Sequence, residues 1–251
     1  MIEALYSAAS GMLTQQQGLD VVANNLANAG TVGYKRDRLD QTDLAYQAFK
    51  LPTGNDGNVG LGAAPGSISK EMGQGILTET GKATDVAIQG DGFLKVTRPD
   101  GTFAYTRAGN LQIDAEGYMG LPSGELLQPR IRVEAGTSDV AIAQDGKVTG
   151  VRNGAKVDIG QIQTVTFPNP RGLTPIGGNL FVSSANSGNE DAGNPGTGTR
   201  GVLSAGYTEG SNVQIATEMV TMITTQRAFE AAARVVSASD EMWGIANGLR
   251  R

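Results

Sequence analysis

The residues of this chain that could carry chemistry are its carboxylates. Its 251 residues include no cysteine and no histidine, so thiol and imidazole catalysis, the usual zinc sites and a Ser-His-Asp triad are excluded. A pair of acids could still hydrolyse a glycan, and five lie near turn signals: Asp85, Asp91, Asp100, Asp114 and Glu116. Turn chemistry explains Asp91, Asp100 and Asp114 more simply, and no pair stands out. We therefore predict that the chain is not an enzyme, with a secreted cell-wall-remodelling hydrolase as the alternative.

A glycine-rich stretch is the other feature that could hold a ligand. The sequence "GNVGLG", which begins at Gly57, has the look of a loop that cradles a phosphate. It lacks the preceding strand, the lysine and the helix start that such a loop needs. The sequence therefore predicts no cofactor, and it singles out no catalytic or metal-binding residue.

Charge and hydropathy narrow the classes of protein further. The formal net charge is −5 and the pI is about 4.9, with no basic stripe, which argues against a nucleic-acid scaffold. No apolar run reaches the length of a membrane span. The first residues, "MIEALYSAASGMLTQQQ", have neither the basic nor the continuous apolar segment of a cleaved secretion signal. If the protein is exported, we expect its N-terminus to stay intact.

Amphipathic helices are expected at both ends of the chain. In the first, mostly apolar residues recur at alternating steps of three and four, as in a heptad seam. That seam is Leu5, Ala8, Met12, Gln15, Leu19, Val22, Leu26 and Ala29. Gly30 follows it, where a left-handed cap is expected. The seam of the second helix is Ile215, Met219, Met222, Gln226, Phe229, Ala233, Val236, Asp240 and Trp243.

The middle of the chain has the pattern of β structure. Strand-like runs alternate with glycine-rich turn signals: "GFLKV" and "TFAYT" flank Pro99-Asp100-Gly101, and "DVAIAQDGKVTGV" predicts a second hairpin. The expected fold is mixed α and β, with long N- and C-terminal helices paired as a coiled coil and a central all-β domain looped out between them. The expected boundaries are 1–33 and 212–251 for the helical domain, 34–72 for an extended glycine-rich connecting segment, and 73–211 for the β domain.

The surface of the N-terminal helix is unusual for a helix in water. Asp20 is the only charge on its outer face, and Gly11 and Gly18 lie beside the seam, although each interior glycine costs about 1 kcal/mol in helix propensity. Its end carries three asparagines: Asn24, Asn25 and Asn28. We interpret them as hydrogen-bonding groups at helix–helix contacts, where a charge would cost too much to desolvate. The alternative is a fraying helix end that asparagine merely stops.

Long segments of the chain resemble bacterial flagellar rod and hook proteins. The segments "SAASGM" and "LDVVANNLANAGTVGYKR" are similar to the N-terminal signature of that family. The segments "TDVAIQGDGFLKV" and "YTRAGNLQIDAEGYM" resemble its central β region, and "GYTEGSNVQIATEMVTMITTQRAFEAAARVVSASDEM" resembles its C-terminal third. Within the family, "YKRDRLDQTDLAYQ" and "TQRAFEAAARVVSASDEM" are most like distal rod proteins, and proximal rod proteins are the nearest alternative.

The resemblance implies a structural subunit that assembles in many copies into a rigid helical tube, transmits motor torque and encloses an export channel. The terminal helices would form an inner coiled-coil layer, with the β domain outside it. The partners would be copies of the chain, other rod and hook proteins, the flagellar export apparatus and surrounding ring proteins, with no nucleic acid and no membrane span. The subunit would lie outside the cytoplasm in the flagellar basal body, in the periplasm of a Gram-negative cell.

Two sets of residues are expected to matter for such an assembly. The subunit-interface set lies on the helical seams and the asparagine-bearing face: Leu5, Met12, Leu19, Val22, Asn24, Asn25, Leu26, Asn28, Met219, Met222, Phe229, Val236 and Trp243. By resemblance, a second set adds stiffness to the distal rod: Ala48, Leu51, Gly54, Val59 and Ala63. This second segment is shorter here than in the distal rod pattern.

Overall fold

The computed structural model describes residues 2–50 and 56–248, which form two compact units. Unit 1 contains the described residues of 2–27, 37–70 and 214–248, and unit 2 contains residues 28–36 and 71–213. The chain therefore passes between the units four times. The predicted stiffness residues Leu51 and Gly54 lie outside the described residues.

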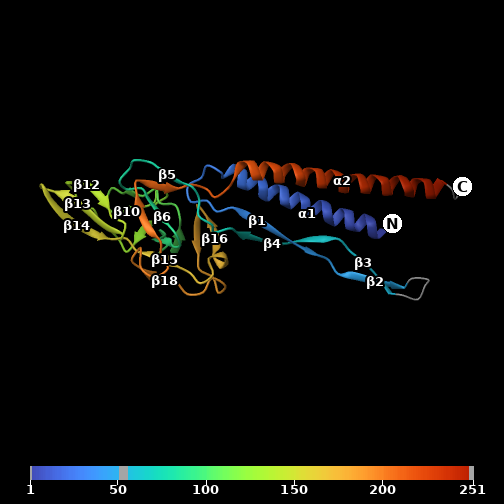
Figure 1. The fold of residues 1–251 in the computed structure, drawn as a ribbon, viewed down its shortest axis with the longest axis horizontal. Helices are drawn as coiled ribbons and strands as arrows, with labels where there is room; N and C mark the ends of the chain where they lie inside the picture. Colours follow the sequence, from blue (N-terminus) through green and yellow to red (C-terminus); the bar gives the residue numbers. More distant parts are fainter. Residues whose placement is uncertain (1, 51–55, 249–251) are drawn as a thin grey trace. The chain divides into compact units, whose positions relative to one another are not determined.

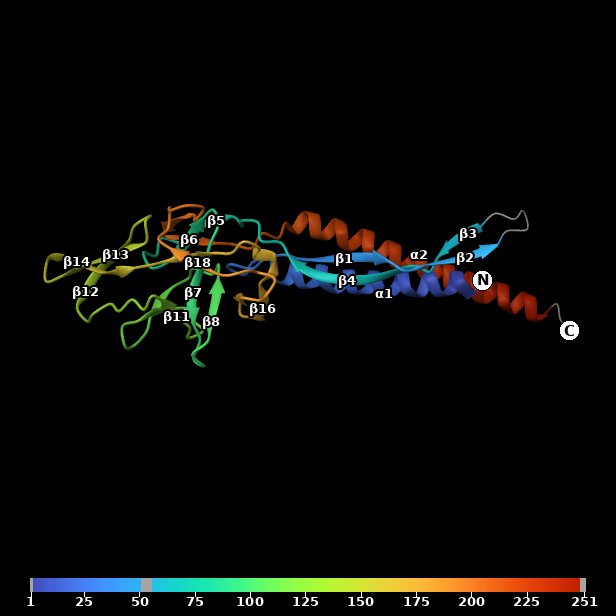
Figure 2. The same cartoon turned by 90° about the horizontal axis from the view of Figure 1, so that it is seen from below.

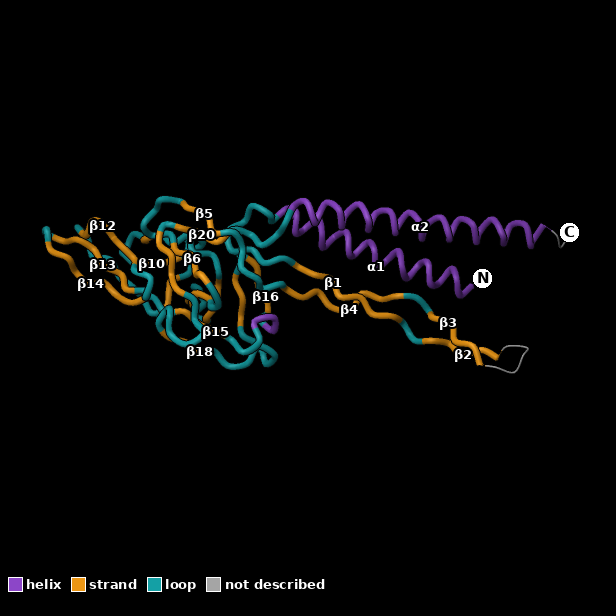
Figure 3. Tube along the Cα trace, in the orientation of Figure 1, coloured by secondary structure: helices purple, strands orange, loops and turns teal. Residues whose placement is uncertain are grey.

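Unit 1 is built on two helices that lie side by side, α1 (Ile2–Ala27) and α2 (Ile215–Gly248) (Figures 1 and 3). The residues after α1 form a turn in which the Thr31 N–H donates to the Asn28 carbonyl at 3.1 Å. The first left-handed glycine after the helix is Gly33, with φ of 70°. The left-handed cap predicted at Gly30 is therefore wrong, because the Asn28 turn already supplies the helix end with partners.

Two antiparallel β pairs also belong to unit 1. In the first pair, β1 (Asp37–Asp43) runs beside β4 (Ala63–Lys70), with Asp37 opposite Lys70. In the second, β2 (Tyr46–Lys50) runs beside β3 (Asp56–Gly60). Figure 2 shows β1 and β4 lying along α1, which both strands contact. The chain thus covers one face of its own first helix with a β hairpin.

Small residues on α1 allow this hairpin to approach. The Cβ of any residue larger than glycine at position 62 would collide with the Ser10 hydroxyl. The Thr14 hydroxyl, which is buried, donates to the Ala63 carbonyl at 3.3 Å. A Cβ added at Gly18 would lie 3.9 Å from Leu39, which is an ordinary packing distance. The small and polar face of α1 is therefore occupied, in part, by backbone of the same chain.

The predicted fold class needs correction here. The expectation of two helices paired as a coiled coil, with β structure confined to a central domain looped out between them, is wrong. The helices do pair, but unit 1 also contains β1, β4, β2 and β3, in the segment expected to be an extended connection. A heptad seam would bury its apolar positions in a coiled coil, whereas the fully buried positions of α1, over residues 5–27 whose burial is described, are Thr14, Val21, Val22 and Asn25. Three of these four lie off the predicted seam.

The largest sheet of unit 2 is antiparallel, and β7 at its centre pairs with β8, β11 and β15. Its strands are β7 (Phe93–Thr97), β8 (Phe103–Thr106), β9 (Gln112–Ile113), β10 (Met119–Gly120), β11 (Leu126–Gln128), β15 (Thr164–Thr166), β16 (Thr174–Gly177), β17 (Leu180–Val182) and β18 (Asp191–Gly193). A short 3-10 helix, η1 (Pro170–Gly172), precedes β16. The predicted hairpin around Pro99-Asp100-Gly101 is confirmed as β7 and β8.

Three smaller sheets complete unit 2. One has the strand order β12 (Thr137–Ile142), β13 (Lys147–Arg152) and β14 (Ala155–Gln161), and it contains the second predicted hairpin. The other two are pairs: β5 (Leu77–Glu79) with β20 (Tyr207–Glu209), and β6 (Val86–Gln89) with β19 (Val202–Ala205). Each of these pairs therefore joins a strand near the start of unit 2, β5 or β6, to a strand near its end, β20 or β19.

Unit 2 contains two apolar cores. The larger gathers aliphatic side chains from most of the strands, among them Ile88, Leu94, Leu127, Val148 and Leu203. The smaller is mainly aromatic: Phe93, Tyr105, Val165, Phe167, Leu173 and Phe181. Tyr105 and Phe167 meet edge to face, with ring centroids 4.8 Å apart, a favourable arrangement for aromatic pairs. Unit 2 therefore buries a substantial apolar core of its own.

Candidate assembly interface

Unit 1 differs from unit 2 in where it keeps its apolar side chains. Among its described residues, Val21 and Val22 are the only apolar side chains that are fully buried. Its exposed large apolar residues are Tyr6, Leu13, Tyr46, Ile68, Ile215, Met219, Val220, Ile223, Phe229, Val235, Met242, Trp243 and Ile245. Apolar surface of this extent, on a unit with so small a core, indicates a surface that other protein covers.

A groove between the two helices forms part of this surface. Its volume is about 670 Å³, and its lining residues are Gln15, Gln16, Leu19, Thr225, Gln226, Phe229 and Glu230. Leu19 and Phe229, both predicted interface residues, supply the apolar part of the wall. Phe229 is 41% exposed, so much of its ring remains available for contact. The groove combines apolar walls with neutral amide groups and one carboxylate, that of Glu230, a composition suited to a helix or loop of another chain.

The predicted interface residues fall into three groups by exposure. Exposed residues are Asn24, Met219, Phe229 and Trp243. Half-buried residues are Leu5, Met12, Leu19, Leu26, Asn28, Met222 and Val236. Val22 and Asn25 are fully buried within the chain itself. Their role between subunits remains a prediction, and it applies most directly to the exposed group.

Asn25 has partners inside its own chain. Its side-chain amide donates to the Asp37 carbonyl, and its carbonyl oxygen accepts the Asp37 N–H, each at 2.8 Å. The same amide lies 3.3 Å from Glu218 Oε2 on α2. Asn25 therefore joins α1, the first residue of β1 and α2, and it serves as a double-ended backbone partner that neither a charged residue nor an alanine could replace.

The carboxylate of Asp37 has two further partners. Its carboxylate forms an ion pair with Lys70 on β4 at 2.9 Å, with both side chains largely buried. Asn24 donates to the same carboxylate at 3.3 Å in a more exposed position. Because Asp37 and Lys70 are opposite one another at the end of the β1–β4 pair, this ion pair fixes the register of the hairpin where it meets α1. The sequence pattern indicated the asparagines but gave no sign of these partners.

The described stiffness residues lie in the unit 1 hairpins. Ala48 is exposed on β2, opposite Asn58, and Val59 lies on β3, opposite Gln47. Ala63 begins β4, opposite Asp43. The described parts of this segment therefore form β structure that continues from the β1–β4 pair, and its contribution to stiffness remains a prediction.

Sequence reasoning missed a group of buried charges in unit 2, which we call the charge cluster: Lys35, Arg107 and Glu209. Lys35 Nζ lies 2.6 Å from Glu209 Oε1, and Arg107 Nη1 lies 3.1 Å from Glu209 Oε2. The exposed fraction of each side chain is 0%, 4% and 0% for Lys35, Arg107 and Glu209, respectively. The two oxygens of one carboxylate thus neutralise two different cations.

Backbone groups complete the coordination of the charge cluster. Lys35 Nζ donates to the Gly73 carbonyl at 2.7 Å, and the Gly75 N–H donates to Glu209 at 2.8 Å. Arg107 donates to the Gly90 carbonyl at 2.9 Å. Burial lowers the pKa of Lys35 below its ordinary value of 10.5, while the neighbouring Glu209 carboxylate opposes that shift. No local sequence signal could identify this cluster, because Lys35 and Glu209 are 174 residues apart in the chain.

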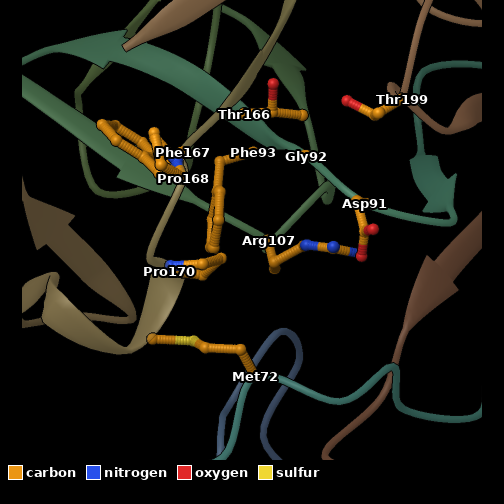
Figure 4. Close-up of a pocket in the computed structure, with 10 residues that line it drawn as sticks. All are labelled: Met72, Asp91, Gly92, Phe93, Arg107, Thr166, Phe167, Pro168, Pro170 and Thr199. Atoms are coloured by element: carbon orange, nitrogen blue, oxygen red, sulfur yellow. The ribbon is translucent and has the colours of Figure 1, made fainter. Parts of the chain in front are cut away.

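The five carboxylates considered for hydrolysis do not gather into an active site. Asp100 accepts the Thr102 N–H at 2.9 Å, and Asp114 accepts the N–H groups of Glu116 and Tyr118, which confirms their predicted role in turns. Asp114 and Glu116 both line one open pocket, but the Asp114 carboxylate there accepts the N–H groups of its own turn. Asp91 borders a separate cavity of about 380 Å³, whose other walls are mainly apolar: Met72, Gly92, Phe93, Arg107, Thr166, Phe167, Pro168, Pro170 and Thr199 (Figure 4). A single acid among aromatic and proline side chains does not provide the paired carboxylates of a glycosidase.

Comparison with known proteins identifies the family. Residues 5–35 match the family described as flagella basal body rod protein, residues 87–150 match the flagellar hook protein FlgE/F/G D1 domain, and residues 204–249 match the C-terminal domain of flagellar basal body rod FlgEFG proteins. The chain is 41% identical to the flagellar basal-body rod protein FlgG of Borreliella burgdorferi over the whole of both chains. The chain belongs to the flagellar basal-body rod protein family.

Within this family of rod proteins, two FlgG proteins are more similar to the chain than one FlgF protein is. The chain is 39% identical to FlgG of Caulobacter vibrioides, covering 99% of this chain and all of the relative. Identity to FlgF of the same organism is 30%, covering 96% of this chain and 95% of the relative. The resemblance found in the sequence, to flagellar rod proteins of the FlgG type, is confirmed.

The rod subunit is a structural protein of the flagellar basal body and not an enzyme, as its relatives indicate. The matched segments include α1 with Lys35, the β6–β8 region with Arg107, and Glu209 with α2. No helix in the described part of the chain combines the length and the hydropathy that a membrane span requires.

Proposed function

We propose that this chain is the subunit of the distal rod, where many copies polymerise through unit 1 into a rigid helical tube. The observation that carries the proposal is the exposed apolar surface of unit 1 set against its small core. An isolated subunit would leave that surface in water, whereas a helical lattice of identical copies would bury it. The relatives named FlgG, a rod protein, support the placement in the rod.

In this proposal the tube has an inner and an outer part. Unit 1, with the predicted interface residues of α1 and α2, forms the inner layer around an export channel, and unit 2 forms the outer layer. Torque from the motor passes along the lattice through many packed contacts, which have few alternative arrangements and therefore resist deformation. The β2–β3 hairpin, with Ala48 and Val59, adds contacts between neighbouring subunits and so adds stiffness.

The partners follow from the same proposal. Other copies of the chain contact the helices, and other rod and hook proteins continue the lattice at its ends. The flagellar export apparatus delivers the chain to its site outside the cytoplasm, in the periplasm where the cell has an outer membrane, and ring proteins surround the finished rod. The absence of cysteine is compatible with assembly in an oxidising compartment.

Electron microscopy of the purified full chain tests the proposal. Concentrated protein under assembly conditions should form straight tubes. Phe229→Asp should abolish them, because a charge would be buried against the apolar wall of the groove, while the strand signal in circular dichroism stays unchanged. The matched control is Thr224→Asp, a charge on an exposed residue of the same helix that does not line the groove; it should still form tubes.

Two results would contradict the proposal. Normal tubes from the Phe229→Asp variant would show that the groove plays no part in assembly. A chain that stays monomeric at all concentrations, and that releases fragments from purified peptidoglycan, would instead support a cell-wall hydrolase.

A further inference from the structure

The chain crosses between the two units four times, and three short segments of unit 2 lie next to these crossings. These are residues 28–36, which leave and rejoin unit 1, residues 71–75, which follow β4, and residues 209–213, which precede α2. Any force that reaches unit 2 from the helices along the covalent chain must pass through these segments. How firmly they are held to one another and to the core of unit 2 therefore matters for a subunit that transmits torque.

The structure joins each of these segments to the other two. Lys35 of the first segment bonds to the Gly73 carbonyl of the second and to Glu209 of the third, at 2.7 and 2.6 Å. The Gly75 N–H of the second bonds to Glu209 of the third at 2.8 Å. The Gly33 N–H adds a further bond to the Glu209 carbonyl at 2.8 Å. Glu209, in the third segment, is thus the common partner of the other two.

Asn212 forms a second, uncharged junction beside the charge cluster. Its side-chain oxygen accepts the Arg36 N–H at 2.8 Å, and its amide donates to the Glu71 carbonyl at 2.8 Å. The Glu71 N–H in turn donates to the Arg36 carbonyl at 2.8 Å. This half-buried side chain therefore repeats, with neutral groups, the connection that the charge cluster makes with buried charges.

Arg107 anchors the joined segments to the core of unit 2. It follows β8, contacts Glu209 at 3.1 Å and donates to the Gly90 carbonyl, just beyond β6, at 2.9 Å. Its guanidinium also lies 5.3 Å from the centre of the Phe93 ring, in the aromatic core, within the range of a cation–π contact. The cluster therefore links the connecting segments to both the sheet and the aromatic core.

The free-energy cost of burying charges indicates that the charge cluster fixes the position of these segments more than it stabilises unit 2. Removing charges from water carries a large free-energy cost, so that apolar replacement of a buried ion pair is often neutral or stabilising. Apolar packing could not restrain these particular segments in the same way, because Gly33, Gly73 and Gly75 have no side chains to pack. Directional bonds to their backbone groups are the available means of fixing them.

We propose that Lys35, Arg107 and Glu209, with Asn212 beside them, act as a mechanical clamp that makes the three connecting segments move as one body with unit 2. This inference rests on the proposed function, since a clamp of this kind matters only in a subunit that carries load. The clamp gives the assembled rod resistance to bending and twisting, and it contributes little to the stability of unit 2.

Amide hydrogen exchange on the full-length chain tests the clamp directly. The triple variant Lys35→Met, Arg107→Met and Glu209→Leu replaces the whole charge cluster with apolar side chains. Exchange at the Gly75 amide should become about tenfold faster or more, because its partner, the Glu209 carboxylate, is lost. Exchange at Ile88 and Leu94, in the core strands, should stay unchanged. The matched control is Lys95→Met with Glu190→Gln, which removes an equally short ion pair of unit 2 that is remote in sequence from all three segments; it should leave the Gly75 amide unaffected.

Tubes assembled from the triple variant should form in normal yield but bend more, with a persistence length in micrographs clearly below that of the parent chain.

If the triple variant does not fold, Asn212→Ala decides, because it removes a neutral, half-buried side chain and should speed exchange at the Arg36 amide alone. Uniformly faster exchange across Ile88 and Leu94 would overturn the proposal and make the cluster a folding determinant. Unchanged exchange at the connecting segments, or unchanged persistence length, would also overturn it. Failure of the parent chain to form tubes would instead count against the proposed function, which the exchange experiment does not require.

Discussion

At the scale of single residues, Asn25 shows how a polar side chain can be worth more than a better helix former. Alanine would gain about 0.6 kcal/mol in helix propensity. It would also leave the Asp37 N–H and carbonyl without the two 2.8 Å bonds that Asn25 supplies, at a cost of about 1–3 kcal/mol. The second effect is larger, so Asn25→Ala should lower the free energy of unfolding of unit 1 by about 1–2 kcal/mol.

Urea unfolding of the full chain, followed by the helical circular dichroism signal at a concentration where unit 1 is ordered, measures this difference. Asn24→Ala is the matched control, since Asn24 is exposed and one position away, and it should change stability by no more than about 0.5 kcal/mol. Equal or greater stability of Asn25→Ala would favour the alternative that the asparagines only end the helix.

Glu190 gives unit 2 a dependence on acid. Its carboxylate bonds to Lys95 Nζ at 2.6 Å and accepts the Tyr105 hydroxyl. Partial burial raises the pKa of Glu190, but these two bonds together lower it by more. The pKa of Glu190 therefore lies below its ordinary value of 4.5. A carboxylate whose pKa is lowered on folding adds stability above its unfolded pKa and loses it as the pH falls through its folded pKa. Glu190→Gln should therefore be less stable than the parent chain at neutral pH, and the difference should shrink as the pH falls below 4.5.

Thermal unfolding of both proteins across that pH range gives the measurement. Tyr105→Phe and Lys95→Met should each reduce the parent chain's pH dependence, because each removes a group that lowers the pKa of Glu190. A difference between Glu190→Gln and the parent that stays constant down to acid pH would show that the carboxylate charge does not contribute.

Residue types could be predicted from the sequence more readily than residue partners. The turn roles of Asp100 and Asp114 were predictable because turn chemistry acts over two to four neighbouring residues. The partners of Asn25 and Lys35 were not, because Asp37, Gly73 and Glu209 reach them only through tertiary folding. A buried charge also contradicts the general rule that charges face water, so no pattern of spacing points to the charge cluster.

At the scale of elements, the loop after α1 contains two glycines, and its backbone requires a glycine at position 33 but not at position 30. Gly33 has φ of 70°, and an added Cβ would lie 2.5 Å from the Ala108 backbone nitrogen. Gly33→Ala should therefore destabilise unit 2 by about 1–3 kcal/mol or more, through strain and collision together. At Gly30 an added Cβ would meet nothing within 4 Å, so Gly30→Ala should be neutral or stabilising by up to about 1 kcal/mol.

Urea unfolding followed by a strand signal compares the two variants within one loop. Equal effects would mean that the backbone of this loop can shift to relieve the contact with Ala108. The comparison also corrects the sequence interpretation, which assigned the special backbone position to Gly30 because it directly follows the apolar seam.

The β1–β4 pair marks the limit of prediction at this scale. The β1 sequence "DRLDQTD" contains three aspartates, which are depleted in strands, so its pattern does not predict a strand. It becomes one because α1 offers a face of small residues and because Asn25 and Lys70 hold Asp37 at its start. The long helices and the hairpin at Pro99-Asp100-Gly101, by contrast, were predictable because their signals are local.

At the scale of the whole molecule, the two units should differ sharply in stability before assembly. Unit 2 has two apolar cores, while unit 1 fully buries only Val21 and Val22 among the apolar side chains of its described residues. Burying apolar area is the main source of folding free energy, so unit 1 has little of it to set against the entropy lost by two long helices. We therefore expect the subunit in dilute solution to keep unit 2 folded while its terminal helices are largely unfolded.

Amide exchange on dilute and assembled protein separates this expectation from a uniformly folded subunit. In dilute protein, residues 5–27 should exchange with little protection and Leu94 and Leu127 with strong protection; in tubes, both should be protected. The gain on assembly should be lost at higher dilution, because burial supplied by neighbouring copies depends on their concentration. Strong protection of residues 5–27 in the dilute subunit would mean that α2 and the β1–β4 pair already stabilise α1, and that assembly buries a surface formed in advance instead of completing a fold.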